Sequence, residues 1–195
     1  MRVIAGSAGG LTLKSPRSDL RPTMEKVRGA IFDSLRDVVP GARVLDLFAG
    51  SGALGIEALS RGAASVTFVE SDRRAVSVLE QNLAHTRLIG SVQSADVFRY
   101  LDRFAAPGSF DLILADPPYA KAAGERDFAP ELLGSNSLRA ALAPDGIFVL
   151  EHLPDAQLAL EPHWELVREK RYGATGVTFL RAHEVAMARS HPAAG

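Results

Sequence analysis

The run Asp116-Pro117-Pro118-Tyr119 combines residue types that could hold a planar ring bearing an amino group. The Asp116 carboxylate and the Pro117 carbonyl are two hydrogen-bond acceptors, which matches the two hydrogens of an exocyclic amine. The prolines restrict the backbone, and the Tyr119 ring offers a face on which a base could stack. Because such an amine is a poor nucleophile, holding it in line with an electrophile would promote its reaction. The plainer interpretation is a rigid proline turn at the end of a strand.

A second candidate site is the glycine-rich run 50–55, which matches G-x-G-x-x-G. It directly follows the apolar stretch 44–48, and Glu70 lies 20 residues beyond Gly50 at the end of the next such stretch. The glycines allow backbone N–H groups to approach a ligand, and a carboxylate at the position of Glu70 can accept hydrogen bonds from both hydroxyls of a ribose. This spacing predicts a site for a nucleoside-containing cofactor.

The carboxylate of Asp46 distinguishes between the two cofactors that fit, NAD and S-adenosylmethionine. It would repel an anionic pyrophosphate and attract a cationic sulfonium and ammonium, so S-adenosylmethionine is favoured. Asp96 could accept a hydrogen bond from the adenine amino group, with Val97 beside the ring, although capping a helix is an equally compatible role for Asp96. The predicted cofactor site comprises Asp46, Phe48, Ala49, Gly50, Ser51, Gly52, Gly55, Glu70, Ser71, Asp96 and Val97.

The elements that would position these residues alternate between strand and helix patterns. Such alternation is typical of an α/β fold with a mainly parallel sheet and helices on both faces. The pattern predicts seven strands, the last two an antiparallel pair, at 44–48, 65–70, 91–95, 110–115, 146–151, 164–172 and 177–181. A small hairpin (2–5 and 11–13) and a helix (24–35) are expected before them as an appendage.

Positive charge is concentrated in the first 28 residues, which hold six basic side chains against two acidic ones. The whole chain has a formal net charge of −1, so the remainder is acidic. A basic segment on a mildly acidic body could hold a polyanion by neutralising phosphates, although a solvated surface would have the same composition. The candidate phosphate contacts are Lys14, Arg17, Arg21 and Arg28, and Arg28 could instead pair with a carboxylate.

Composition excludes several classes of protein. Hydrophobic residues make up 47% and charged residues 23% of the 195 residues, which is typical of one folded domain and not of disorder. Cysteine is absent and the five histidines lack metal-ligand spacing, so no disulfide and no bound metal are expected. No apolar run approaches membrane-spanning length, which predicts a cytoplasmic protein with no membrane partner.

The stretch 44–52, Glu70 and the Asp116–Tyr119 tetrapeptide together resemble the class I S-adenosylmethionine-dependent amino-methyltransferases. Within that group the chain is similar to the bacterial 16S rRNA guanine-N2 methyltransferases of the RsmD family, through the stretches 2–6, 21–32 and 172–175. The resemblance implies a Rossmann-like methyltransferase fold. It also implies methyl transfer to N2 of a specific guanine in 16S rRNA, in the small ribosomal subunit or an assembly intermediate.

Three regions are therefore expected: a basic N-terminal appendage that binds RNA (1–40), a methyltransferase domain (41–182) and a loose tail (183–195). The protein is expected to be a monomer. Two other functions remain open from the residues. A DNA adenine-N6 or cytosine-N4 methyltransferase would use the same two motifs, but the chain has little length for a separate recognition domain. A non-catalytic RNA-binding assembly factor could use the cofactor only to stabilise its fold.

Overall fold

The computed structural model describes residues 1–15, 22–120, 124–160 and 162–183. The seven strands are β1 (Arg43–Leu47), β2 (Ser65–Glu70), β3 (Ser91–Ser94), β4 (Phe110–Ala115), β5 (Leu142–His152), β6 (Trp164–Tyr172) and β7 (Thr175–Ala182). The helices in these residues are α1 (Pro22–Ser34), α2 (Ala53–Ser60), α3 (Arg73–Thr86), α4 (Val97–Arg103), α5 (Phe128–Gly134) and α6 (Asn136–Ala141).

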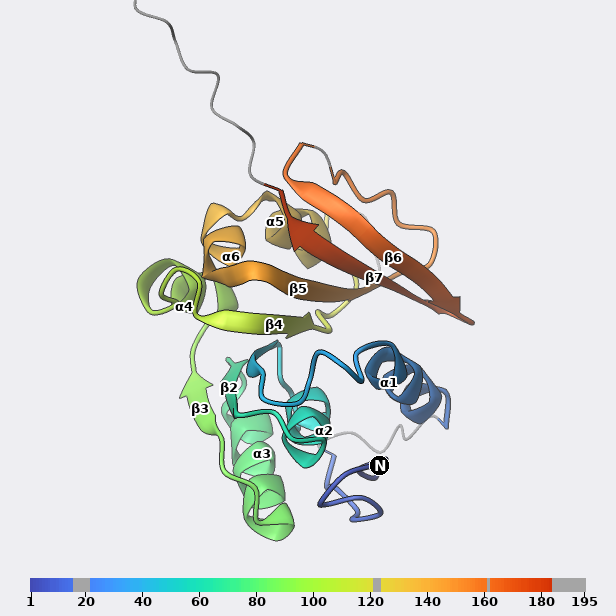
Figure 1. Ribbon diagram of the computed structural model, residues 1–195, viewed down its shortest axis with the longest axis vertical. Helices are drawn as coiled ribbons and strands as arrows, with labels where there is room; N and C mark the ends of the chain where they lie inside the picture. The colour runs from blue at the N-terminus through green and yellow to red at the C-terminus, as the bar shows by residue number, and fades with distance from the viewer. Residues whose placement is uncertain (16–21, 121–123, 161, 184–195) are drawn as a thin grey trace, which may run out of the picture.

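The strands form one sheet in the order β3-β2-β1-β4-β5-β7-β6 (Figure 1). β1 to β5 are parallel to one another, and β7 lies antiparallel between β5 and β6. The order reverses at β1, whose neighbours are β2 and β4, and open α/β sheets bind ligands at the carboxyl ends of strands at such a point. The predicted fold class, with its mainly parallel seven-stranded sheet and antiparallel closing pair, is confirmed.

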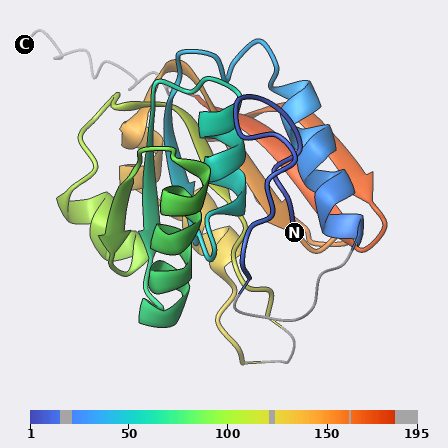
Figure 2. The same cartoon turned by 90° about the horizontal axis from the view of Figure 1, so that it is seen from below.

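Helices cover both faces of the sheet. Helices α1, α2 and α3 lie side by side on one face (Figure 2), and α4, α5 and α6 lie on the other. The central strands are buried on both sides: alternate residues of β4 belong to two separate core clusters, Leu112 and Leu114 to one and Ile113 and Ala115 to the other. Near-continuous apolar strands are therefore required, which is why strands such as 110–115 are recognisable in the sequence.

The N-terminal hairpin packs on helix α2. The bridge Arg2↔Thr12 is its strand pairing, and the carboxylate of Glu57 in α2 accepts the backbone N–H groups of Ile4 and Ala5 at 2.7 and 3.1 Å. Gly6 has φ +83°, and a Cβ there would lie 1.8 Å from the Ser60 carbonyl oxygen. Close backbone approach therefore explains the glycine, and the hairpin shares the core of the sheet domain.

Some element boundaries differ from those expected. The first helix begins at Pro22 and not at residue 24, and proline at the first helical position lacks an N–H that would be unpaired there anyway. Helices α4 and α5 had no predicted counterpart, and β5 begins at Leu142, four residues before the strand start expected at residue 146. Of the expected tail, residues 184–195 lie outside the described residues. No helix within the described ranges is long and apolar enough to cross a membrane.

Candidate active site

The glycine turn between β1 and α2 has a backbone that side chains would disturb. Gly50 and Gly52 have φ of +55° and +83°, and Phe48, which precedes them, also has a positive φ of +57°. A Cβ on Gly52 would lie 2.1 Å from Leu79 Cδ1. A Cβ on Gly55 would lie 2.2 Å from a ring carbon of Phe68 in β2. The glycines thus permit both the turn and the close packing of α2 on the sheet.

Two carboxylates bind the backbone of this turn and of the helix that follows it. Asp46 Oδ2 accepts the N–H of Gly55 at 2.8 Å, and Glu70 Oε2 accepts the N–H of Gly50 at 2.8 Å. Glu70 Oε1 accepts the N–H of Asp72 at 2.8 Å. A carboxylate can accept about four hydrogen bonds, so Glu70 retains acceptor capacity for the two hydroxyls of a ribose.

Asp46 is almost completely inaccessible to solvent, with 1% of its surface exposed. Burial, with smaller contributions from the nearby carboxylates of Asp116 and Glu70, raises the pKa of its carboxyl from 3.8 to about 7, against the lowering effect of the Gly55 N–H. The interior therefore disfavours the anion, and a ligand cation would relieve that cost. An anionic pyrophosphate would increase it.

A buried asparagine ties the same turn to the N-terminal segment. The Asn82 amide nitrogen donates to the carbonyls of Ser51 and Lys14 at 2.9 and 3.0 Å, and its oxygen accepts the Lys14 N–H at 2.8 Å. Asn82 lies in α3 and was not predicted as a site residue. Its polar side chain among the apolar positions of α3 was the available signal.

The predicted adenine residues lie at the start of α4. Asp96 caps this helix, accepting the Arg99 N–H at 3.0 Å, so the capping role is confirmed and acceptor capacity remains on the carboxylate. Val97 is buried beneath it, and Ser71 is exposed beside Glu70. The Phe48 and Phe128 rings pack edge to face, with their centroids 5.0 Å apart, so α5 also borders the site.

The tetrapeptide lies where β4 ends. Asp116 is the first residue after the strand, and burial raises the pKa of its carboxyl to about 6. Pro117 is buried and Pro118 is exposed. The Tyr119 hydroxyl is hydrogen-bonded to Thr175 at the start of β7, and burial together with neighbouring carboxylates raises the pKa of Tyr119 to about 12. The turn is therefore held from the antiparallel end of the sheet.

A further acid, Glu151 of β5, lies beside Asp116 and was not predicted. β4 and β5 pair in register at Ala115↔Leu150, so Asp116 and Glu151 follow at the same level. Burial and the charge of Asp116 raise the pKa of Glu151 well above its ordinary value. The signal was an acid at the end of an apolar strand, and the register that places it beside Asp116 is a tertiary feature.

The predicted phosphate contacts have different positions. The prediction that Arg28 contacts a phosphate is corrected by the structure. Arg28 is 5% exposed, its Nε lies 3.8 Å from Glu57 Oε2, and its guanidinium donates a hydrogen bond to the Arg2 carbonyl. The guanidinium is therefore not available to a phosphate. Lys14 is exposed, with Nζ 2.8 Å from the side-chain oxygen of Gln81. Arg17 and Arg21 lie outside the described residues.

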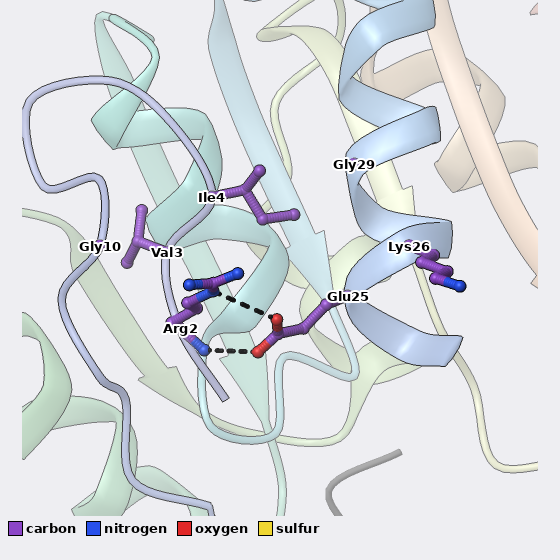
Figure 3. Close-up of a pocket in the computed structure, with 7 residues that line it drawn as sticks. All are labelled: Arg2, Val3, Ile4, Gly10, Glu25, Lys26 and Gly29. Carbon is purple, nitrogen blue, oxygen red and sulfur yellow. Dashed lines mark hydrogen bonds and ion pairs between the residues drawn. The ribbon is translucent and has the colours of Figure 1, made fainter. Parts of the chain in front are cut away.

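A groove of about 590 Å³ lies between the hairpin and α1 (Figure 3). Its lining residues are Arg2, Val3, Ile4, Gly10, Glu25, Lys26 and Gly29. The two Glu25 oxygens bind Arg2, one through its backbone N–H at 3.0 Å and one through its guanidinium at 3.5 Å. The Lys26 side chain points away from that ion pair, so one cation of the groove is paired and the other extends outward.

Across the part of the chain that the structure describes, no group of three or more histidine, cysteine, aspartate or glutamate side chains could hold a metal ion.

A family model described as conserved hypothetical protein 95 matches residues 1–181. The chain belongs to this family. Two relatives named ribosomal RNA small subunit methyltransferase D are similar to it: that of Haemophilus influenzae is 34% identical over 94% of this chain and 93% of its own length, and that of Escherichia coli K12 is 36% identical over 89% and 85%. A hypothetical protein of Thermus thermophilus has a similar structure, with a TM-score of 0.77 and 33% identity over 93% of this chain and 99% of that one. The resemblance predicted from the motifs is confirmed.

Proposed function

We propose that this protein is an S-adenosylmethionine-dependent methyltransferase that methylates the N2 amino group of a specific guanine in 16S rRNA. The observation that carries the proposal is the Asp116 carboxylate, which follows β4 beside the glycine turn and accepts no hydrogen bond from any described residue. The names of the relatives support ribosomal RNA of the small subunit as the substrate. A substrate of that kind implies a cytoplasmic enzyme.

The residues around the turn fit the proposed cofactor. S-adenosylmethionine supplies a methyl group on a positively charged sulfur, which is an electrophile that an amine can attack. Glu70 would accept hydrogen bonds from the ribose hydroxyls, and Asp96 would accept one from the adenine amino group. Asp46 would favour the positive charge of the cofactor electrostatically. A Cβ on Gly50 would meet only the Phe48 carbonyl oxygen, at 3.9 Å, so the absence of a side chain there leaves space open to a ligand.

Asp116 and Pro117 would act on the amine of the target base. The Asp116 carboxylate and the Pro117 carbonyl would accept hydrogen bonds from the two amine hydrogens and so direct the nitrogen lone pair toward the methyl group. Tyr119 would provide a face on which the base stacks. Positive charge develops on the nitrogen as the new C–N bond forms, and a carboxylate with low solvent exposure stabilises that charge. The proton then leaves either to Asp116 or to water.

A base inside paired structure cannot reach Asp116, so the target guanine would be unpaired or flipped out. The N-terminal segment supplies the cations that would hold the surrounding phosphates: Lys14, Arg2 and Lys26 are exposed in the described structure. Arg17 and Arg21 remain proposed contacts on the basis of the charge pattern alone.

Substitution of Asp116 by alanine tests the enzymatic part of the proposal. We expect methyl transfer to small ribosomal subunits lacking the modification to fall by at least about 100-fold, with S-adenosylmethionine affinity changed less than about threefold. The matched control is Asp111→Ala, which removes a carboxylate from the exposed end of the same strand. An equal loss of cofactor affinity in Asp116→Ala, or unchanged transfer, would refute the assignment.

A further inference from the structure

Glu151 lies at the same level of the sheet as Asp116 and on the same face. Leu114 pairs with Val149 and Ala115 with Leu150, so the next residues of these parallel strands are Asp116 and Glu151. Side chains alternate between the two faces of a sheet, and neighbouring strands in register point their side chains the same way. The two carboxylates therefore project side by side, with Glu151 on the side of Asp116 away from β1 and the glycine turn.

Neither carboxylate accepts a hydrogen bond from any residue that the structure describes, although both are partly buried. The charged and titratable groups that act on Glu151 are Asp116, Asp46, Arg28 and Tyr119. Arg28, from α1, is the one cation among them and favours the ionised form of Glu151. Two adjacent acceptors without protein donors, in a site that excludes much of the solvent, suit a ligand that brings its own donors.

We propose that Glu151 accepts a hydrogen bond from N1–H of the target guanine while Asp116 accepts one from its N2 amino group. This inference rests on the proposed function and names the residue that selects the base. Guanine carries these two donors next to each other on one edge, which matches two neighbouring carboxylates. Adenine and cytosine instead present a ring-nitrogen acceptor beside the exocyclic amine, so an ionised Glu151 would face a lone pair and remain unsatisfied.

The expected contribution to specificity follows from that difference. A site built to bind a donor rejects an analogue that lacks it, because the acceptor is left buried and unpaired. Discrimination of about 100-fold or more between N1–H and an unprotonated N1 is expected from one such charged contact. The charge of Arg28 favours the ionised form of Glu151, against the burial and the charge of Asp116 that raise the pKa of Glu151, and a guanine N1–H would favour the same ionised form.

The experiment compares two versions of the same substrate. Small subunits are reconstituted with 16S rRNA in which the guanine methylated by the wild-type protein is kept or replaced by 2,6-diaminopurine. This analogue retains the 2-amino group but has an acceptor at N1. We expect kcat/KM of the wild-type protein to fall at least about 100-fold on replacement. The quantity to compare between variants is the ratio of kcat/KM for the guanine substrate to kcat/KM for the diaminopurine substrate. In Glu151→Gln, whose amide can donate a hydrogen bond to N1, we expect this ratio to be at least tenfold lower than in the wild-type protein. The control Glu165→Gln, exposed on β6, should leave the ratio unchanged.

Three results would overturn the inference. Equal transfer by the wild-type protein to guanine and diaminopurine would show that N1–H is not recognised, and so would faster transfer to diaminopurine, which a protonated Glu151 would favour. A ratio in Glu151→Gln equal to that of the wild type would remove Glu151 from base selection. Absence of methylation of any guanine by the wild-type protein is a different outcome, because it refutes the proposed function itself.

Discussion

Replacing Asp46 by asparagine should stabilise the protein at alkaline pH while weakening its cofactor site. Burial raises the pKa of Asp46 to about 7 from an ordinary 3.8. Between these two values the folded protein holds a proton that the unfolded chain has released, so this carboxyl makes the free energy of unfolding decrease as the pH rises. Asparagine retains the oxygen that accepts the Gly55 N–H and does not ionise.

The magnitude follows from the two pKa values. One pKa unit corresponds to about 1.4 kcal/mol, so the ionisable Asp46 lowers the free energy of unfolding by about 4 kcal/mol at pH 8 and about 2 kcal/mol at pH 5. An unsatisfied amide N–H in the variant costs about 1–3 kcal/mol at every pH. The difference in stability between Asp46→Asn and wild type should therefore change by about 2–3 kcal/mol from pH 5 to pH 8, in favour of the variant.

Urea unfolding at the two pH values measures this difference through the fluorescence of Trp164, which is 4% exposed and packs on Phe148. Asp111→Asn is the control, because Arg43 lowers the pKa of Asp111 and its titration lies below this pH range. The variant should also bind S-adenosylmethionine at least about tenfold more weakly, since it lacks a charge opposite a cation. Parallel pH profiles for Asp46→Asn and wild type would refute the account of a buried, reluctantly ionised carboxyl.

Further predictions concern the glycine turn, its anchor and the groove. Gly55→Ala should lower the free energy of unfolding by about 1–3 kcal/mol because its Cβ overlaps a ring of β2, whereas Gly134→Ala, with no atom within 4 Å of the added Cβ, should change it by less than about 0.5 kcal/mol in urea titrations. Asn82→Ala should cost about 1–3 kcal/mol and weaken S-adenosylmethionine binding in calorimetry, and an unchanged affinity would show that the turn does not need this anchor. Changing Arg2 and Lys26 together to glutamine should reduce the salt slope of RNA binding by about 1–2, and an identical slope would exclude the groove from phosphate contact.

Much of the sheet could be predicted because its central strands are buried on both faces. The stretches at β1, β2 and β4 are short apolar runs bounded by turn residues, and that pattern depends on local sequence alone. Helices α4 and α5 were missed for the opposite reason, since each has seven residues and too few turns for a helical period to be visible.

The site could be predicted only where its residues are close in sequence or follow a known spacing. The glycine turn and the tetrapeptide meet that condition. Glu151 and Asn82 do not, because the register of β4 with β5 and the packing of α3 bring them to the site. Arg28 shows the converse error: a cation in a basic segment is suited to a phosphate by composition, but its partner Glu57 lies on another helix, beyond the reach of any local pattern.

The central claim is tested most directly by transfer of radiolabelled methyl groups from S-adenosylmethionine to three substrates side by side. These are small ribosomal subunits lacking the modification, protein-free 16S rRNA and duplex DNA. We predict label in ribosomal RNA that digestion and mapping assign to N2 of one guanine, and none in DNA. Label in DNA alone would contradict the account in favour of a DNA amino-methyltransferase, and no label in any substrate despite bound cofactor would indicate a binding protein.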